Sequence, residues 1–288
     1  RSLRSGFPFQ SFCSFLTKRI STAIPNAKKC RIDMERRNWT REELILAYNL
    51  YCKIPYGQFN TSSIDVKELA QIIGRTPGAV AFKLVNFVSL DPRQKLLGRK
   101  GATNIGKLDK EIFEEFSTNF DEMFYESENL LSAKSLDFHK RGNVEIFVDN
   151  SKKGEYKIRE TKVRVNQDYF RTLVLSNYSN ICSVTGIKVP ELLIASHIKP
   201  WSKDEKNRLN PSNGICLSAT FDKAFDKGLI SIDKSYNILF SSKLKKYSKE
   251  NFYQEELSKF ESRQIIPPMK FLPNEEFLIY HNDVVFQP

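Results

Sequence analysis

The segment from Leu192 to Gly228 restricts the fold of this chain more than any other. Its pattern predicts an apolar strand over Leu192–Ile198, a polar loop, and a second short strand over Gly214–Ser218. A helix over Ala219–Asp226 follows directly, and Gly228 stands where a left-handed residue commonly ends a helix. The order strand, loop, strand, helix places this part of the chain in the α+β class.

Three polar residues of this segment indicate chemistry. His197 ends an apolar strand, where burying an imidazole without partners costs free energy. Asp222 and Asp226 are four residues apart, so one face of the helix presents both carboxylates. Adjacent carboxylates repel and are tolerated best around a cation, and hard oxygen ligands suit Mg²⁺ or Mn²⁺. We expect the imidazole and both carboxylates to converge on one cation-sized gap.

The segment resembles a known family in three stretches. These read ASHIKPW at residues 195–201, NRLNPSNG at 207–214 and AFDKGLI at 224–230. Together they resemble the HNH, or ββα-metal, endonucleases, and most of all a bacterial restriction-type branch of that family. The likeness extends more weakly over residues 38–285 and implies a C-terminal ββα-metal nuclease domain.

The resemblance also implies a role for each site residue. His197 matches the general base at the end of the first strand, and Asn213 matches the asparagine that braces the loop and orients this base. Asp222 and Asp226 match ligand positions for one divalent metal, Mg²⁺ or Mn²⁺. A neutral imidazole can accept a proton from water near pH 7, and a cation can stabilise the leaving oxygen. The chemistry of the residues therefore agrees with phosphodiester hydrolysis.

Two further cations and two departures from the family pattern lie in the same segment. Lys199 and Arg208 are candidates to clamp the phosphates that flank the cleaved bond. Ser196 stands where many relatives have Asp or His, and Phe221 stands where close relatives have His. We expect a metal-dependent DNA endonuclease of restriction or defence type. The alternatives are a DNA-binding protein with a degenerate HNH site, which Phe221 would explain, and an HNH ribonuclease.

The sequence pattern over residues 34–92 predicts a helical domain that resembles a helix-turn-helix. Thr40 and Glu43 form a capping box before an apolar run, and Asp65 can cap a second helix. A third helix is expected to begin at Thr76-Pro77, after a turn that contains glycine. If this unit reads DNA, Arg75 and Lys83 are the candidate contacts. The alternative is a plain helical hairpin.

The remaining boundaries follow from composition. Residues 1–33 hold no acidic residue before Asp33 and are expected to be an extension outside the fold, or else a targeting peptide. Over residues 93–165 the sequence predicts a basic loop, an acidic helix over Leu108–Leu131 and a connecting strand over 151–165. Residues 166–288 predict the nuclease domain with a C-terminal extension that carries a basic stretch, Lys243–Lys246.

The charge balance indicates an anionic partner. Lysine and arginine number 45 against 34 acidic residues, for a formal net charge of +11, which is typical of proteins that bind nucleic acid. No apolar run approaches the roughly 18 residues of a membrane span. The five cysteines form no C-x-x-C pair, so a reducing, cytoplasmic setting is expected. Duplex DNA is the expected partner, and a double-strand cutter could act as a homodimer.

Overall fold

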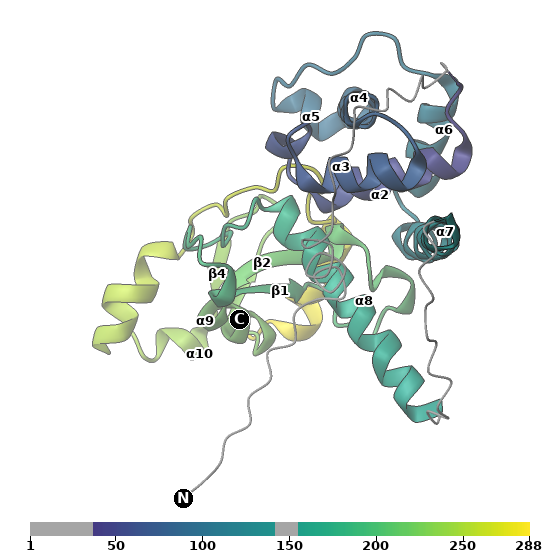
Figure 1. Ribbon diagram of the computed structural model, residues 1–288. Coiled ribbons are helices and arrows are strands. Elements are labelled where there is room, and N and C mark those ends of the chain that lie inside the picture. The colour runs from purple at the N-terminus through teal and green to yellow at the C-terminus, as the bar shows by residue number, and fades with distance from the viewer. Residues whose placement is uncertain (1–36, 142–154) are drawn as a thin grey trace, which may run out of the picture. The chain divides into compact units, whose positions relative to one another are not determined.

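Capped helices form the first part of the computed structural model, which describes residues 37–141 and 155–288 (Figure 1). Side chains are described for 37–134 and 166–288, so the predicted extension at 1–33 lies outside the description. From Trp39 to Pro288 the chain forms one unit. Its first helices are α2 (Arg41–Lys53), α3 (Ile64–Ile73), α4 (Pro77–Leu90) and α5 (Pro92–Leu96).

The start signals of these helices are confirmed with one exception. Thr40 and Glu43 form the capping box of α2, and the Thr76 hydroxyl accepts from Ala79 N at the start of α4. The N-cap residue of α3 is Ser63 rather than Asp65. Asp65 lies in the first turn of the helix, where the positive end of the helix dipole stabilises its carboxylate. Gly74 ends α3 with a φ of 65°, a conformation that favours glycine.

The acidic region is two helices rather than the single one predicted. These are α6 (Lys107–Phe116) and α7 (Phe120–Arg141). The break falls at Ser117–Asn119, where polar side chains bond the backbone: Ser117 donates to Glu114 O and Asn119 donates to Glu115 O. Such residues compete with helical hydrogen bonds, and this competition explains the interruption.

The connecting strand predicted over 151–165 is wrong for the residues described there. Residues from Glu155 onward belong to α8 (Glu155–Asn177), which continues into the helix expected after Asp168. Lysine, arginine and glutamate are good helix formers, and they dominate this stretch. The alternation Val163, Val165 is too short to outweigh them.

The strand–loop–strand–helix unit forms as predicted. β1 (Leu193–His197) pairs antiparallel with β2 (Gly214–Ser218), and His197 lies opposite Gly214. α9 (Ala219–Asp226) follows at once, and Gly228 has a φ of 63° just beyond it. All five positions of β2 are buried, which requires cover on both faces because successive side chains alternate. α8 and α9 both pack on this hairpin (Figure 1).

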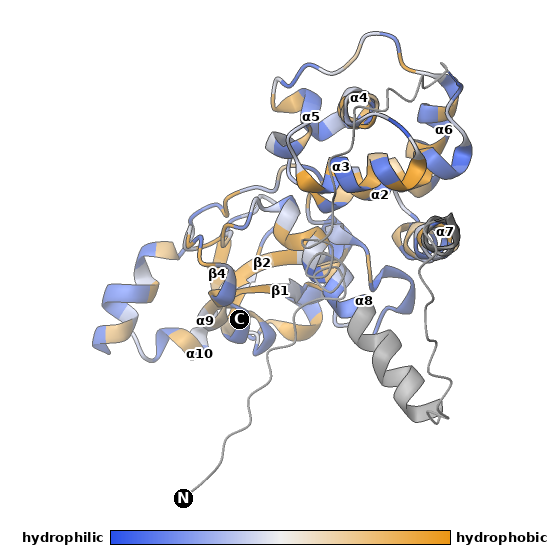
Figure 2. Cartoon of the chain, in the orientation of Figure 1, coloured by the Kyte–Doolittle hydropathy of each residue, from blue (hydrophilic) through white to orange (hydrophobic). Residues whose placement is uncertain are grey.

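The C-terminal extension adds a second hairpin and short helices. β3 (Ile230–Ile232) pairs with β4 (Ile238–Phe240), followed by α10 (Ser242–Lys245) and α11 (Glu275–Tyr280). Short 3-10 turns precede both strands of the first hairpin, at Pro190–Leu192 and Pro211–Asn213. Figure 2 shows hydrophobic residues concentrated on α2 and on β1 and β2, where the core lies. Of the helices described, none is long and apolar enough to cross a membrane.

A buried lysine links the C-terminal extension to α2. The ammonium of Lys270 is fully enclosed and donates to the carbonyls of Tyr51, Cys52 and Ile54, at 2.5, 3.1 and 2.7 Å. These carbonyls belong to the last turn of α2 and the residue after it, where the helix itself supplies no partners. Lys270 therefore caps α2 through a cation at the negative end of its dipole.

Candidate active site

His197 is held at the end of β1 by three groups. Its ring stacks on Phe170 of α8, with centroids 3.7 Å apart, and meets the Trp201 ring edge-on at 5.5 Å. Nε2 lies 3.0 Å from the carbonyl oxygen of Arg208 across the loop. Ring stacking and this hydrogen bond together leave the imidazole little freedom to rotate.

The hydrogen bond to Arg208 selects one tautomer of His197. A carbonyl oxygen can only accept, so Nε2 carries the hydrogen and Nδ1 of the neutral ring keeps its lone pair. Burial lowers the pKa of His197 below 6.5, because desolvation penalises the imidazolium more than the carbonyl stabilises it. The ring is thus neutral at pH 7 and has Nδ1 available as a proton acceptor.

Asn213 joins the two ends of the loop between β1 and β2. Its side chain is buried; Oδ1 accepts from Lys199 N at 2.8 Å, and Nδ2 donates to Lys199 O at 3.1 Å and to Asn207 O at 3.3 Å. The residue after Asn207 supplies the carbonyl that holds His197. Asn213 thus braces the loop whose Arg208 carbonyl contacts His197, and its role in orienting the base stays a prediction.

Gly214 leaves the space in which His197 and Phe170 stack. A Cβ at this position would lie 2.3 Å from Val174 Cγ2 and 2.9 Å from Phe170 Cζ, closer than real carbon atoms approach. Both contacts come from α8, which therefore packs directly against the strand pair at the level of His197. The glycine of the Asn213-Gly214 dipeptide is therefore required by the packing of α8 on the strand pair, and not only by a turn.

Asp222 and Asp226 lie on α9 as predicted, and Ser196 of β1 faces the first of them. Burial raises the pKa of the Asp222 carboxyl; the Ser196 hydroxyl lowers it, and the charge of Asp226 raises it again. Ser196 is 3% exposed, and its Oγ has no hydrogen-bond partner of good geometry among the described residues. Two carboxylates and an unpartnered hydroxyl form an oxygen donor set of the kind that hard divalent cations prefer.

The structure does not gather His197 with these carboxylates into one ligand group. Among the described side chains, no three of His, Cys, Asp or Glu lie close enough together to hold a metal ion. Ser196 and His197 are consecutive residues of β1, so their side chains leave opposite faces of the strand. The convergence expected from the sequence is therefore not observed among the described residues.

Lys199 and Arg208 hold the loop together in the structure. The Lys199 ammonium lies 3.0 Å from the Asp204 carboxylate, whose pKa falls below its usual value. Arg208 pairs with Glu205 at 3.1 Å, donates to Trp201 O and lies over the Trp201 ring. Both side chains are about a quarter exposed, so each cation still reaches the surface while its internal partners orient it.

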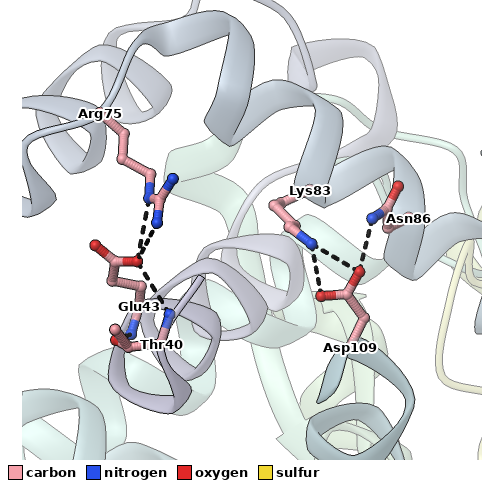
Figure 3. A network of polar contacts seen from close by, with 6 residues as sticks. All are labelled: Thr40, Glu43, Arg75, Lys83, Asn86 and Asp109. Carbon is pink, nitrogen blue, oxygen red and sulfur yellow. Dashed lines mark hydrogen bonds and ion pairs between the residues drawn. The ribbon is translucent and has the colours of Figure 1, made fainter. Parts of the chain in front are cut away.

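Arg75 and Lys83 lie in buried ion pairs (Figure 3). Arg75 contacts the Glu43 carboxylate at 2.7 Å, and the two side chains are 9% and 3% exposed. Lys83 lies 2.8 Å from both oxygens of Asp109, which also accepts from Asn86. These pairs fasten α4 and its N-terminal turn to α2 and α6, so the structure favours a structural role for the two predicted DNA contacts.

His281 positions α9, a role that the sequence did not reveal. Its Nε2 lies 3.2 Å from Phe225 O, its Nδ1 lies 2.7 Å from the Ser231 hydroxyl, and its ring stacks on Phe225 at 3.7 Å. Burial lowers its pKa to about 4, so the ring is neutral. Phe225 lies between the two aspartates of α9, and no spacing in the sequence links His281 to it.

One comparison with known proteins bears on this site. A family model described as HNH endonuclease matches residues 182–233. The matched residues contain β1, β2 and α9 and therefore His197, Asn213, Asp222 and Asp226. No curated protein matches the chain. The match supports a nuclease, a class of hydrolase, and the likeness covers this one segment.

Proposed function

We propose that the protein is a metal-dependent endonuclease that hydrolyses DNA phosphodiester bonds, with His197 as general base. The observation that carries the proposal is the fixed tautomer of His197 inside the segment that matches the HNH endonuclease model. Nδ1 of the neutral ring accepts a proton from the attacking water, and Arg208 O stabilises the imidazolium that forms. Cleavage would leave 5′-phosphate and 3′-hydroxyl ends.

Asp222, Asp226 and Ser196 are the residues that would hold the divalent metal. Bound there, Mg²⁺ or Mn²⁺ would act as a Lewis acid on the phosphate and its leaving oxygen. The raised pKa of Asp222 and its like-charged neighbour fit a site that a cation completes. Because Ser196 and His197 leave opposite faces of β1, a phosphodiester that engages both the imidazole and the metal would have to lie across the end of this strand.

The substrate part of the proposal follows from charge. A net charge of +11 favours a polyanion, and Lys199 and Arg208 reach the surface beside the proposed base. We therefore propose duplex DNA as the substrate. We also propose that the protein serves restriction or defence and that a homodimer cuts both strands.

Phe221, the residue that motivates the degenerate-site alternative, is buried beneath α9. This side chain is 4% exposed and packs edge-on against Phe260, with ring centroids 5.2 Å apart. It therefore fills the core under α9 instead of standing open in the site. Cleavage of plasmid DNA by the unchanged protein therefore decides between the nuclease and the degenerate site.

Metal-dependent cleavage of plasmid DNA tests the proposal. We expect the protein to nick or linearise supercoiled plasmid with Mg²⁺ or Mn²⁺ and to leave it intact with EDTA. Asp222→Asn should require at least about tenfold more metal for the same rate, because a ligand contributes at least as much affinity as the outer partners of a metal site. Unchanged cleavage in EDTA would contradict the metal, and cleavage of RNA alone would support the ribonuclease.

The cleavage rate should depend on pH in a way that reports the lowered pKa of His197. A base is active when deprotonated, so kcat/KM should rise with pH to a plateau, with a midpoint below 6.5. Asp222 must also ionise to bind metal, and its raised pKa shapes the same acid side of the profile. Rates measured from pH 4.5 to 8 at saturating metal check this; a midpoint above 6.5 would contradict the tautomer and burial described here.

A further inference from the structure

A run of lysines follows β4, beyond the residues that match the HNH endonuclease model. Residues 242–252 read SKLKKYSKENF and contain four lysines and one glutamate. The family match ends at residue 233, so this segment belongs to the C-terminal extension. Nothing in the proposed chemistry of His197 uses it.

Three of the four lysines have no carboxylate partner within the part of the chain whose side chains are described. Lys245 forms an ion pair with Glu261 at 2.6 Å. Lys243, Lys246 and Lys249 are exposed and form no ion pair with any side chain that the structure describes. With Glu250 as its one acidic residue and four lysines, the segment carries a net charge of +3.

Two large aromatic side chains stand on the same segment. Tyr247 is 60% exposed and Phe252 is 57% exposed. Exposed aromatic rings among unpaired cations are a recurring feature of surfaces that bind nucleic acid, where the cations meet phosphates and the rings meet sugars and bases. We call Lys243, Lys246, Tyr247, Lys249 and Phe252 the α10 surface.

The backbone under the α10 surface is fixed at both ends. Leu244 is buried, and beyond the surface Tyr253 is buried with its ring 6.0 Å from that of Phe240. Ser241 caps α10 by accepting from Leu244 N at 3.1 Å. The lysines thus extend from a rigid base, which reduces the entropy lost on binding.

The α10 surface is tied to the helix that carries the proposed metal ligands. Ser241 N donates to Leu229 O, and Leu229 N donates to Ala224 O within α9, each at 2.9 Å. Asp226, a proposed metal ligand, lies between Ala224 and Leu229 in the sequence. The surface therefore begins next to the end of α9, on the nuclease part of the chain.

We infer that the α10 surface binds the phosphate backbone of the DNA that the site cuts, outside the cleaved bond. The inference rests on the proposed function, which it deepens by adding a second contact region to the substrate path. Lys243, Lys246 and Lys249 neutralise phosphates, and Tyr247 packs against the sugar-base face between them. Binding energy from this region holds the duplex while His197 acts on one bond.

An anionic membrane is the competing partner for lysines beside aromatic rings, and the structure disfavours it. A helix that lies in a bilayer interface needs a long apolar face directed outward. α10 has four residues, and its one apolar residue, Leu244, points into the core. The lysines and aromatic rings of the α10 surface therefore fit a dissolved polyanion better than a membrane.

Binding of a fluorescein-labelled duplex in EDTA tests the inference without cleavage. We expect the triple variant Lys243→Gln, Lys246→Gln, Lys249→Gln to bind at least about tenfold more weakly at low salt. The slope of log Kd against log salt should fall by between about 2 and 3, because each phosphate contact contributes about 0.9. Tyr247→Ala should weaken binding without changing this slope.

A matched control removes the same number of charges elsewhere on the C-terminal part. Lys188, Lys234 and Lys259 are exposed, and the latter two pair with Glu275 and Glu256. Their triple glutamine variant should bind DNA almost as the unchanged protein does. An equal loss of DNA binding in both triple variants would show that net charge alone explains the effect and would overturn the inference. The inference would also be overturned if the α10-surface triple variant bound DNA normally but lost binding to vesicles of anionic lipid. Since the assay needs no turnover, it can succeed even if plasmid cleavage fails.

Discussion

We expect His197→Ala to cleave plasmid DNA about 10² to 10⁴ times more slowly than the unchanged protein, the range that a positioned general base contributes. The structure gives the reason: Nδ1 is the one ring nitrogen with a free lone pair, because Nε2 donates to Arg208 O. The measurement is the initial rate of nicking at saturating metal, at a pH on the plateau of the profile.

A second substitution at the same position separates catalysis from loop structure. His197→Gln keeps an N–H donor that can reach Arg208 O but offers no basic nitrogen, so it should be nearly as slow as alanine while unfolding like the unchanged protein. DNA binding in EDTA should persist in both variants. Cleavage at the original rate by the alanine variant would remove His197 from the mechanism.

Lys270→Met should have the largest effect on folding stability. Methionine fills similar space but leaves three buried carbonyls without donors, at about 1–3 kcal/mol for each group. Burial lowers the pKa of Lys270 to about 8, so the ammonium itself is costly to enclose, and removing it recovers part of the loss. We expect a net decrease in the free energy of unfolding of about 3 kcal/mol.

Urea denaturation monitored by far-ultraviolet circular dichroism measures this decrease. Lys259→Met is a suitable control, because its side chain is exposed and pairs with Glu256 three residues away. That variant should unfold within about 0.5 kcal/mol of the unchanged protein. If Lys270→Met matches the control, the three carbonyls have found other partners and the capping role of Lys270 is wrong.

Local signals were enough to predict the elements that carry the site. The capping box of α2, the start of α4 at Thr76, the whole of β2 and α9, and the stop at Gly228 all depend on residues within a few positions of one another. Capping, turn chemistry and apolar runs act over that range, which is why the sequence alone predicts them. The boundary at Ser117–Asn119 and the length of α8 depended on competing weak propensities and were missed.

Residues whose roles depend on distant partners could not be assigned in the same way. Arg75 is 32 residues from Glu43, and Lys83 is 26 from Asp109, so sequence spacing indicated exposed cations where the fold buries them. Lys270 is 219 residues from the first carbonyl it caps. The resemblance to the HNH endonucleases predicts His197 as a base, but the tautomer of its ring follows only from the position of the Arg208 carbonyl.

The last residues described form part of the support for α9. A Cβ at Gly228 would lie 2.0 Å from Val285 O, Gln287 N donates to Gly228 O, and His281 holds Phe225. The helix that carries both aspartates therefore rests on residues outside the stretch that matches the family model. Grafting residues 182–233 onto another scaffold would transplant both aspartates without the tail that fixes their helix, so a portable version must carry the chain through to Gln287.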